Sequence, residues 1–335
     1  MSRIAVMGSG AWGTAIALSL ARRGGHDPTL WSHSPEVSET IAERGENVAF
    51  LPGFSIPKSI RTTSSIEEAL RDAEIVVSVM PSHHVRASYE QFAPFLRSGQ
   101  LLVSATKGIE DETLLRMSEL IADVLGKLGL SLPVGVLSGP SFAQEVAAGA
   151  PTAITIASSD SDLAVRVQRE FGSQSLRLYT NDDVVGVELG GALKNVIAIA
   201  SGIVSGLGLG HNSAAALITR GIAETTRLAV ACGGRSETLA GLSGIGDLVL
   251  TCTGSLSRNR TVGMELGKGR KLVEILAGLH GKVAEGVRTT SAALGLARKH
   301  NVEMPITEQV AAILDEDKSP QEAMRELMSR PGRDE

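Results

Sequence analysis

Short apolar runs alternate with stretches of helical periodicity along the first half of the chain. Apolar runs typical of strands lie at residues 3–7, 29–31, 75–80, 101–105, 134–137, 152–157 and 176–179, with helical patterns at 11–23, 66–71 and 113–128. Strands that are apolar on both faces and separated by helices indicate a parallel sheet with helices on either side. The pattern predicts an α/β fold with a doubly wound, mainly parallel sheet.

The pattern changes after Asn181 and Asp182. From there to about Ser329 the runs of β-branched residues stop, and alanine, leucine, glycine and charged residues recur with helical spacing. Pro305 and Pro320 suit the first turn of a helix. We therefore expect two domains, an α/β domain over 1–181 and an all-α domain over 182–335.

A glycine-rich turn follows the first predicted strand. Residues Gly8–Gly13 read G-x-G-x-x-G, with glycines at 8, 10 and 13, and the first predicted helix begins within them. In this setting the glycines allow a tight turn, close approach of a pyrophosphate and packing of helix on strand, while unpaired N–H groups face the anion. The motif predicts a Rossmann-type dinucleotide-binding domain.

The end of the second strand bears on the choice of dinucleotide. An acidic residue commonly binds the adenosine ribose of NAD at this point, but this chain has Trp31, Ser32 and His33. Because these positions hold no acidic residue, nothing here would repel the 2'-phosphate of NADP, and His33 could donate a hydrogen bond to it. NADP(H) is therefore allowed alongside NAD(H), although His33 could equally be an ordinary surface histidine.

Composition and charge narrow the choice of partners. The 335 residues are 43% hydrophobic and 21% charged, with a net charge of -5, which is typical of a globular protein and offers no bulk attraction to nucleic acid or an anionic bilayer. The uncharged stretch 195–219 is interrupted by glycines and makes a poor membrane span. Two cysteines, Cys232 and Cys252, suit a reducing compartment, and no metal site is expected.

Lys194 is the first candidate for chemistry. It lies in an almost uncharged helical run, on a face shared mainly with small residues such as Gly190 and Ala198. Such a face allows close approach of another element or a ligand, and an enclosed lysine could act as a general acid or base. The alternative is a lysine that extends from a packed helix to solvent.

Further polar residues stand where ligands usually bind. Lys107 follows a strand, and Ser138–Phe142 follows another and is expected to open a helix near Pro140. Asp247 lies beside glycines, and Ser257–Arg260 carries two cations that suit a phosphate. A surface lysine, a helix cap and a solvated basic face are the corresponding structural alternatives.

These motifs together resemble the bacterial NAD(P)-dependent glycerol-3-phosphate dehydrogenase family. The matching segments run in order through nearly the whole chain: GSGAWGTA at 8–15, FLPG at 50–53, ATKG at 105–108, SGPSFA at 138–143, LKNV at 193–196, GIGDL at 244–248 and SRN at 257–259. Ala11 departs from the serine that is frequent in the family, so a backbone contact to the cofactor would remain but a hydroxyl contact would not.

The resemblance implies reduction of dihydroxyacetone phosphate to sn-glycerol 3-phosphate, and the reverse oxidation, for phospholipid synthesis. It implies Lys194 as general acid/base, with Lys107 and Asp247 beside the reacting oxygen. The implied substrate contacts are Lys107, Gly139, Ser141, Lys194, Asn195, Asp247, Ser257, Arg258 and Asn259. The implied cofactor contacts are Gly8, Gly10, Ala11, Trp12, Gly13, His33, Phe50, Lys107, Ala143, Arg258, Val283 and Glu285.

Two alternatives stay open from the residues alone. One is another two-domain β-hydroxyacid-type dehydrogenase, and the other is a dinucleotide-sensing module without catalysis. We expect a cytoplasmic protein with a small-molecule substrate, no nucleic acid and no membrane insertion, and the sequence leaves a homodimer open.

Overall fold

The computed structural model describes residues 2–279 and 283–332. Contacts divide the chain into two compact units, the first made of residues 1–107 and 115–187 and the second of residues 108–114 and 188–335. This grouping differs from the sequence-based limits 1–181 and 182–335 by a few residues and by the short segment 108–114. Those domain limits stay a prediction.

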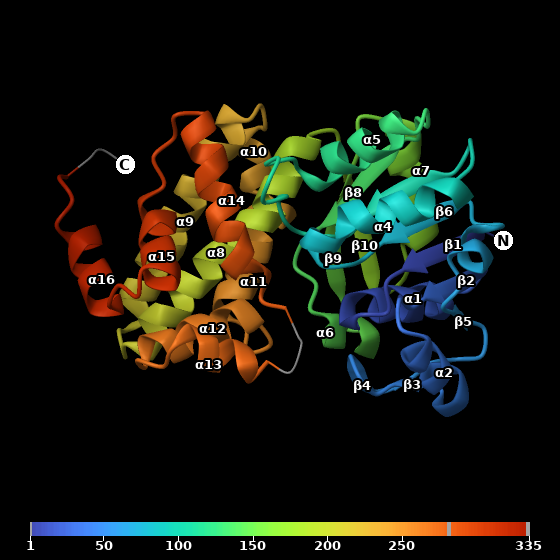
Figure 1. Ribbon diagram of the computed structural model, residues 1–335, viewed down its shortest axis with the longest axis horizontal. Coiled ribbons are helices and arrows are strands. Elements are labelled where there is room, and N and C mark those ends of the chain that lie inside the picture. The colour runs from blue at the N-terminus through green and yellow to red at the C-terminus, as the bar shows by residue number, and fades with distance from the viewer. Residues whose placement is uncertain (1, 280–282, 333–335) are drawn as a thin grey trace. The chain divides into compact units, whose positions relative to one another are not determined.

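The first unit is built on an eight-stranded sheet of order β10-β9-β8-β7-β6-β1-β2-β5 (Figure 1). Its strands are β1 (Ser2–Met7), β2 (His26–Trp31), β5 (Arg61–Thr63), β6 (Ile75–Ser78), β7 (Leu101–Ser104), β8 (Val134–Ser138), β9 (Thr152–Ala157) and β10 (Leu176–Asn181). All neighbouring pairs are parallel except β8 and β9, which one short helix connects. A separate antiparallel pair is formed by β3 (Glu46–Asn47) and β4 (Leu51–Ser55). The mainly parallel α/β sheet predicted from the sequence is confirmed.

Helices cover both faces of this sheet because its strands are apolar on both sides. In β1, Ile4 and Val6 join one core cluster, while Ala5 and Met7 join the cluster on the opposite face. The helices are α1 (Ala11–Arg23), α2 (Pro35–Arg44), α3 (Ile66–Leu70), α4 (Val85–Phe92), α5 (Met117–Lys127), α6 (Ala143–Ala148) and α7 (Ser161–Phe171). Helices α1, α6 and α7 pack on the Ile4 face, and α3, α4 and α5 pack on the Ala5 face.

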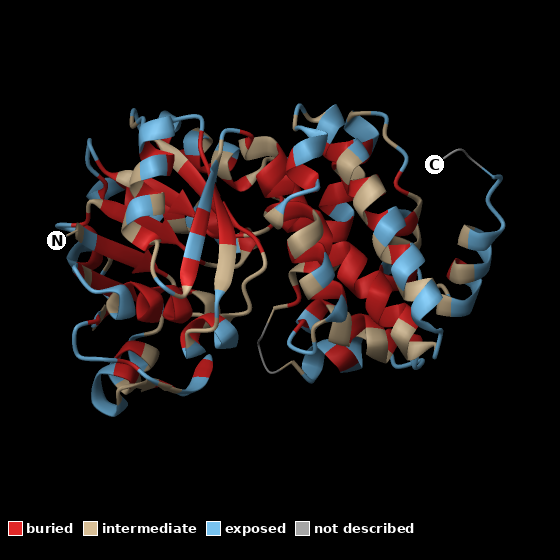
Figure 2. Cartoon of the chain, turned by 180° about the vertical axis from the view of Figure 1, so that it is seen from behind, coloured by how far each residue is buried: buried red, intermediate tan, exposed pale blue. Residues whose placement is uncertain are grey.

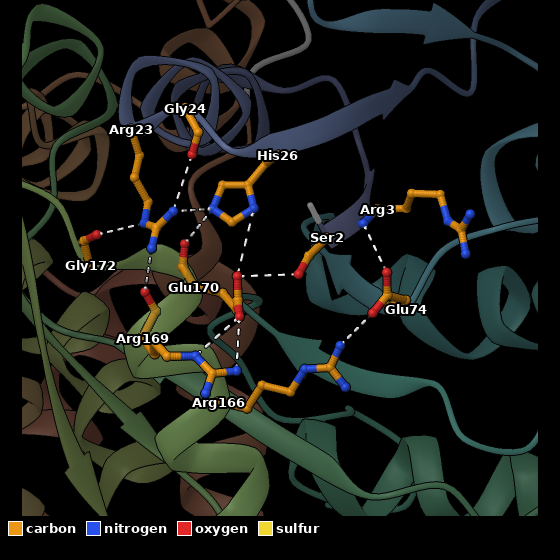
Figure 3. A network of polar contacts seen from close by, with 10 residues as sticks. All are labelled: Ser2, Arg3, Arg23, Gly24, His26, Glu74, Arg166, Arg169, Glu170 and Gly172. Carbon is orange, nitrogen blue, oxygen red and sulfur yellow. Dashed lines mark hydrogen bonds and ion pairs between the residues drawn. The ribbon is translucent and has the colours of Figure 1, made fainter.

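A polar network joins the amino ends of β1 and β2 to the end of α7 (Figure 3). The ring Nε2 of His26 lies 2.7 Å from the backbone oxygen of Glu170 and 3.0 Å from a guanidinium nitrogen of Arg23. Ser2 donates a hydrogen bond to the Glu170 carboxylate at 3.2 Å, and Arg23 donates to the backbone oxygen of Arg169 at 3.0 Å. These residues lie at the amino ends of β1 and β2, whereas the glycine-rich turn follows the carboxyl end of β1, so the network takes no part in that turn.

All regular elements in the described part of the second unit are helical, as predicted. They are α8 (Val184–Gly206), whose first four residues are grouped with the first unit, α9 (His211–Ala231), α10 (Ser236–Leu239), a π-helical turn η3 (Leu242–Gly246), α11 (Asp247–Thr253), α12 (Arg258–Gly267), α13 (Leu272–Ala277), α14 (Glu285–Lys299), α15 (Pro305–Asp315) and α16 (Pro320–Met328). Pro305 and Pro320 each stand in the first turn of a helix, which confirms their predicted positions.

Helix α8 is the buried centre of this second unit. Among the described helices it alone is long and apolar enough to cross a membrane by itself, but the apolar window is 100% buried inside the protein. In Figure 2 most strands of the first unit's sheet and several helices of the second unit are coloured largely as buried. The apolar character of α8 is therefore that of a core helix.

Candidate active site

The glycine-rich turn lies between β1 and α1, where the sequence places it. Gly8 has φ +133°, and a Cβ at this position would lie 1.9 Å from the backbone oxygen of Val79. A Cβ at Gly13 would lie 1.9 Å from the backbone oxygen of Gly8. Glycine is thus required at both positions, first by the backbone conformation and then by the close packing of helix on turn.

Gly10 is the N-cap of α1, and its surroundings fit a dinucleotide phosphate. A Cβ at Gly10 would meet nothing within 4 Å, and no side chain caps the helix. The first N–H groups of a helix lack partners within it and attract an anion. Ala11 and Trp12 form the start of the same helix, with Trp12 partly buried against the core.

Other predicted cofactor residues of the first unit lie at strand ends or at the start of a helix. His33 is exposed just after β2, while the hydroxyls of Ser9 and Ser32 are 2.8 Å apart. Phe50 precedes β4 and is 40% exposed. Ala143 is the first residue of α6, so this helix begins three residues after Pro140, and the expectation that it opens at Pro140 is wrong. The extended conformation of Phe142 holds the preceding segment outside the helix.

Three predicted substrate residues of the first unit come together after β7 and β8. The ammonium of Lys107 donates a hydrogen bond to the backbone oxygen of Gly139 at 3.1 Å, and the Ser141 hydroxyl donates to the same oxygen at 2.9 Å. Gly139 has φ +137°, and a Cβ there would lie 3.0 Å from the Cα of Ile154. The turn therefore depends on glycine and brings Lys107 and Ser141 to one carbonyl.

In the second unit Lys194 is enclosed, not extended to solvent. Its side chain is 9% exposed and forms an ion pair with Asp247, whose side chain is 1% exposed. The approach predicted from the small residues of this face is present: a Cβ at Gly190 would lie 2.5 Å from the backbone oxygen of Ser243, just before α11. This contact brings α11, and with it Asp247, onto the lysine-bearing face of α8.

Thr251 contacts both Lys194 and Asp247, and the sequence analysis did not single it out. Its hydroxyl accepts a hydrogen bond from the Lys194 ammonium at 3.0 Å and donates to the backbone oxygen of Asp247 at 2.6 Å. Because Thr251 stands four residues after Asp247 in α11, both side chains lie on one helix face. The i, i+4 spacing from Asp247 was the signal that could have found it.

A chain of amide hydrogen bonds orders Asn195 beside the lysine in sequence. The side-chain Nδ2 of Asn259 donates to Oδ1 of Asn195 at 3.0 Å, and the backbone N–H of Gly286 donates to Oδ1 of Asn259 at 2.9 Å. A Cβ at Gly286 would lie 2.6 Å from the backbone oxygen of Asn195. Gly286, which sequence reasoning did not single out, thus lets α14 begin directly against α8.

The other predicted residues of the second unit gather around the start of α12. Ser257 is the N-cap of α12 and accepts a hydrogen bond from the backbone N–H of Arg260 at 3.2 Å. Arg258 is exposed and donates to the backbone oxygen of Val283 at 2.9 Å, two residues before Glu285. Within residues 2–279 and 283–332 there is no group of three or more histidine, cysteine, aspartate or glutamate side chains arranged to hold a metal.

A doubly wound sheet with a phosphate-binding glycine turn, joined in one chain to a helical unit with a buried lysine and aspartate, defines a dinucleotide-dependent dehydrogenase. The family model described as NAD-dependent glycerol-3-phosphate dehydrogenase N-terminus matches residues 3–164, and the corresponding C-terminus model matches residues 183–325. The chain belongs to this family.

Individual relatives match this chain over nearly their full lengths. The chain is 68% identical to "Glycerol-3-phosphate dehydrogenase [NAD(P)+]" of Acidobacterium capsulatum, with 100% of both proteins covered. It is 63% identical to the protein of the same name from Koribacter versatilis, over 99% of this chain and 98% of the relative. A crystal structure of glycerol-3-phosphate dehydrogenase from Coxiella burnetii, 40% identical, superposes with a TM-score of 0.93 over 98% of this chain and 99% of that one.

Proposed function

We propose that this chain catalyses the NAD(P)H-dependent, reversible reduction of dihydroxyacetone phosphate to sn-glycerol 3-phosphate, a precursor of glycerophospholipids. The observation that carries the proposal is the enclosed Lys194 ammonium, held by Asp247 and Thr251 in a chain of this family. The family assignment decides against the β-hydroxyacid-type dehydrogenase and the non-catalytic sensing module.

Lys194 acts as the general acid in the reduction and as the general base in the oxidation. The nicotinamide, when bound, supplies or accepts the hydride. Reduction of the ketone leaves negative charge on the carbonyl oxygen, and an ammonium in a buried, preorganised position stabilises this charge and donates the proton. Asp247 and Thr251 hold the ammonium in place.

The remaining residues bind and orient. The substrate contacts are proposed to be Lys107, Gly139 and Ser141 in the first unit and Lys194, Asn195, Asp247, Ser257, Arg258 and Asn259 in the second. The cofactor, NADP(H) or NAD(H), is assigned to Gly8, Gly10, Ala11, Trp12, Gly13, His33, Phe50, Lys107 and Ala143 in the first unit and to Arg258, Val283 and Glu285 in the second. We further propose that the protein acts in the cytoplasm without membrane insertion and that it forms a homodimer.

The test is steady-state turnover of dihydroxyacetone phosphate, followed at the nicotinamide absorbance, in the wild type and in Lys194→Met. We expect kcat to fall by at least about 10²-fold in the variant, as for loss of a general acid, with little change in cofactor affinity. Lys299→Met, at an exposed lysine of α14, is the matched control and keeps wild-type turnover. Wild-type kcat in Lys194→Met would refute the role of the lysine, and turnover of 2-ketoacids in place of the phosphate would refute the substrate.

A further inference from the structure

A buried asparagine outside the glycine motif is bonded directly to it. Asn47, in β3, is 1% exposed, and its side-chain Nδ2 donates to the backbone oxygen of Ser9 at 2.7 Å and to the hydroxyl of Thr14 at 2.9 Å. Its Oδ1 accepts a hydrogen bond from the backbone N–H of Phe50 at 3.2 Å. We propose that Asn47 is a positioning residue for the dinucleotide phosphates, because it fixes the direction of the Gly10 N–H group.

The hydrogen-bond partners of the Asn47 amide fix its orientation. The Thr14 hydroxyl donates to the Ser9 oxygen at 3.2 Å, so its lone pairs are what it offers to Asn47. The side of the amide that faces Ser9 and Thr14 must therefore be the NH₂ group, and the side that faces the Phe50 N–H must be the oxygen. Three hydrogen bonds, two to backbone groups and one to a side-chain hydroxyl, leave one arrangement for this side chain.

The orientation of the peptide between Ser9 and Gly10 follows. In a planar trans peptide the C=O and N–H bonds point to opposite sides of the chain. Two hydrogen bonds, from Asn47 and Thr14, hold the Ser9 carbonyl toward the protein interior. The Gly10 N–H is therefore directed away from Asn47, at the N-cap of α1, where a Cβ on Gly10 would meet open space.

Asn47 also links this turn to a second predicted cofactor contact. The segment from Asn47 to Phe50 precedes β4, and the bond from the Phe50 N–H to the Asn47 oxygen holds its backbone. Without the Asn47 amide the peptide between Ser9 and Gly10 could rotate. The Gly10 N–H would then have to be reoriented before it could bind a phosphate. Such preorganisation raises affinity because ordering is not required at the moment of binding.

This inference rests on the proposed cofactor site, and the test measures binding without turnover. Asn47→Leu keeps the approximate volume of the side chain and removes all three hydrogen bonds. The matched control is Gln100→Met in the same unit, because Gln100 is 3% exposed and also donates to two backbone oxygens, of Leu70 and Ala73, while accepting from the Arg97 N–H. The dissociation constants of NADPH and ADP-ribose are measured by fluorescence titration and calorimetry, and thermal midpoints by scanning calorimetry.

We expect Asn47→Leu to raise both dissociation constants by the same factor, about 10- to 100-fold, since the two ligands share the diphosphate. Gln100→Met lowers the thermal midpoint but leaves both constants within about twofold. In the ligand-free protein, amide hydrogen exchange of the peptide over residues 8–15 becomes faster in Asn47→Leu and not in the control.

The outcomes separate the inference from the function on which it rests. If the wild type binds NADPH and Asn47→Leu binds it equally well, Asn47 only stabilises the fold and the inference is overturned. If the wild type binds neither NADPH nor NADH, the proposed function fails and takes the inference with it. Should Asn47→Leu not fold, Asn47→Asp keeps the acceptor for the Phe50 N–H while placing an oxygen against the Ser9 carbonyl, and the same rise in both constants is expected.

Discussion

Removal of the Asp247 carboxylate gives a quantitative test of the buried ion pair. Replacement by leucine leaves the Lys194 ammonium enclosed, with a side chain 9% exposed, after loss of the carboxylate that faces it. The Thr251 hydroxyl at 3.0 Å is a neutral acceptor and does not replace the charge. The loss in the free energy of unfolding therefore measures how much an unpaired charge held away from water destabilises the protein.

The magnitude follows from the burial of both partners. Breaking a buried pair by removing one member typically lowers the free energy of unfolding by about 3–5 kcal/mol, whereas replacing both members with apolar side chains costs far less. At about 1.4 kcal/mol per tenfold change, the single variant raises the unfolding equilibrium constant by roughly 10²- to 10³·⁵-fold. Lys194→Met combined with Asp247→Leu should recover much of this loss.

Urea denaturation followed by circular dichroism on the wild type, the two single variants and the double variant completes the cycle. We expect the loss in the double variant to be smaller than the sum of the single losses by at least about 2 kcal/mol, because the residues are in contact. Additive losses within about 0.5 kcal/mol would show that the two charges stabilise the protein independently. The reasoning from burial would then be wrong.

Two further predictions concern titratable groups in the cores. The Glu224 carboxylate accepts hydrogen bonds from the backbone N–H groups of Ile306 and Thr307, each at 2.9 Å, at the start of α15. Glu224→Leu leaves these N–H groups without their acceptor and should lower the free energy of unfolding by about 2–4 kcal/mol. A loss below about 0.5 kcal/mol in urea denaturation would contradict this prediction. Burial lowers the pKa of His26, so the unfolded chain binds this proton more readily, and stability present in full above about pH 6.5 is lost as the pH falls through the folded-state pKa. The thermal midpoint of His26→Gln should therefore fall less than that of the wild type when the pH is lowered from about 7.5 to 5.5. Equal falls would contradict the lowered pKa of His26.

The sequence pattern predicts the elements that are apolar and locally regular. The strands near residues 3–7, 75–80 and 101–105 are present because runs apolar on both faces have no stable place except inside a covered parallel sheet. The pair β3 and β4 is not predicted, since β3 has only two residues and β4 contains Pro52 and Gly53, which weaken a strand signal. The segment 108–114 groups with the second unit through tertiary contacts that no local pattern encodes.

The candidate site divides in the same way. The glycine turn and the small-residue face of Lys194 are local patterns, so spacing alone identifies them. Asn47 bonds to Ser9, 38 residues earlier in the chain, and Gly286 bonds to Asn259, 27 residues earlier. Such partners are brought together by the packing of separate elements, and local patterns in a single sequence do not show which elements pack together.

Glycines on two facing helices, Gly202 on α8 and Gly263 on α12, link local pattern and tertiary packing. A Cβ at Gly202 would lie 2.0 Å from the backbone oxygen of Arg260, and a Cβ at Gly263 would lie 1.9 Å from the backbone oxygen of Ile199. Helices α8 and α12 therefore meet backbone to backbone, closer than side chains with a Cβ permit. This approach brings Asn195 on α8 and Asn259 on α12 together, and the side-chain Nδ2 of Asn259 donates a hydrogen bond to Oδ1 of Asn195 at 3.0 Å. Gly202 and Gly263 thus permit the helix contact that brings this amide pair together, next to Lys194 in the sequence.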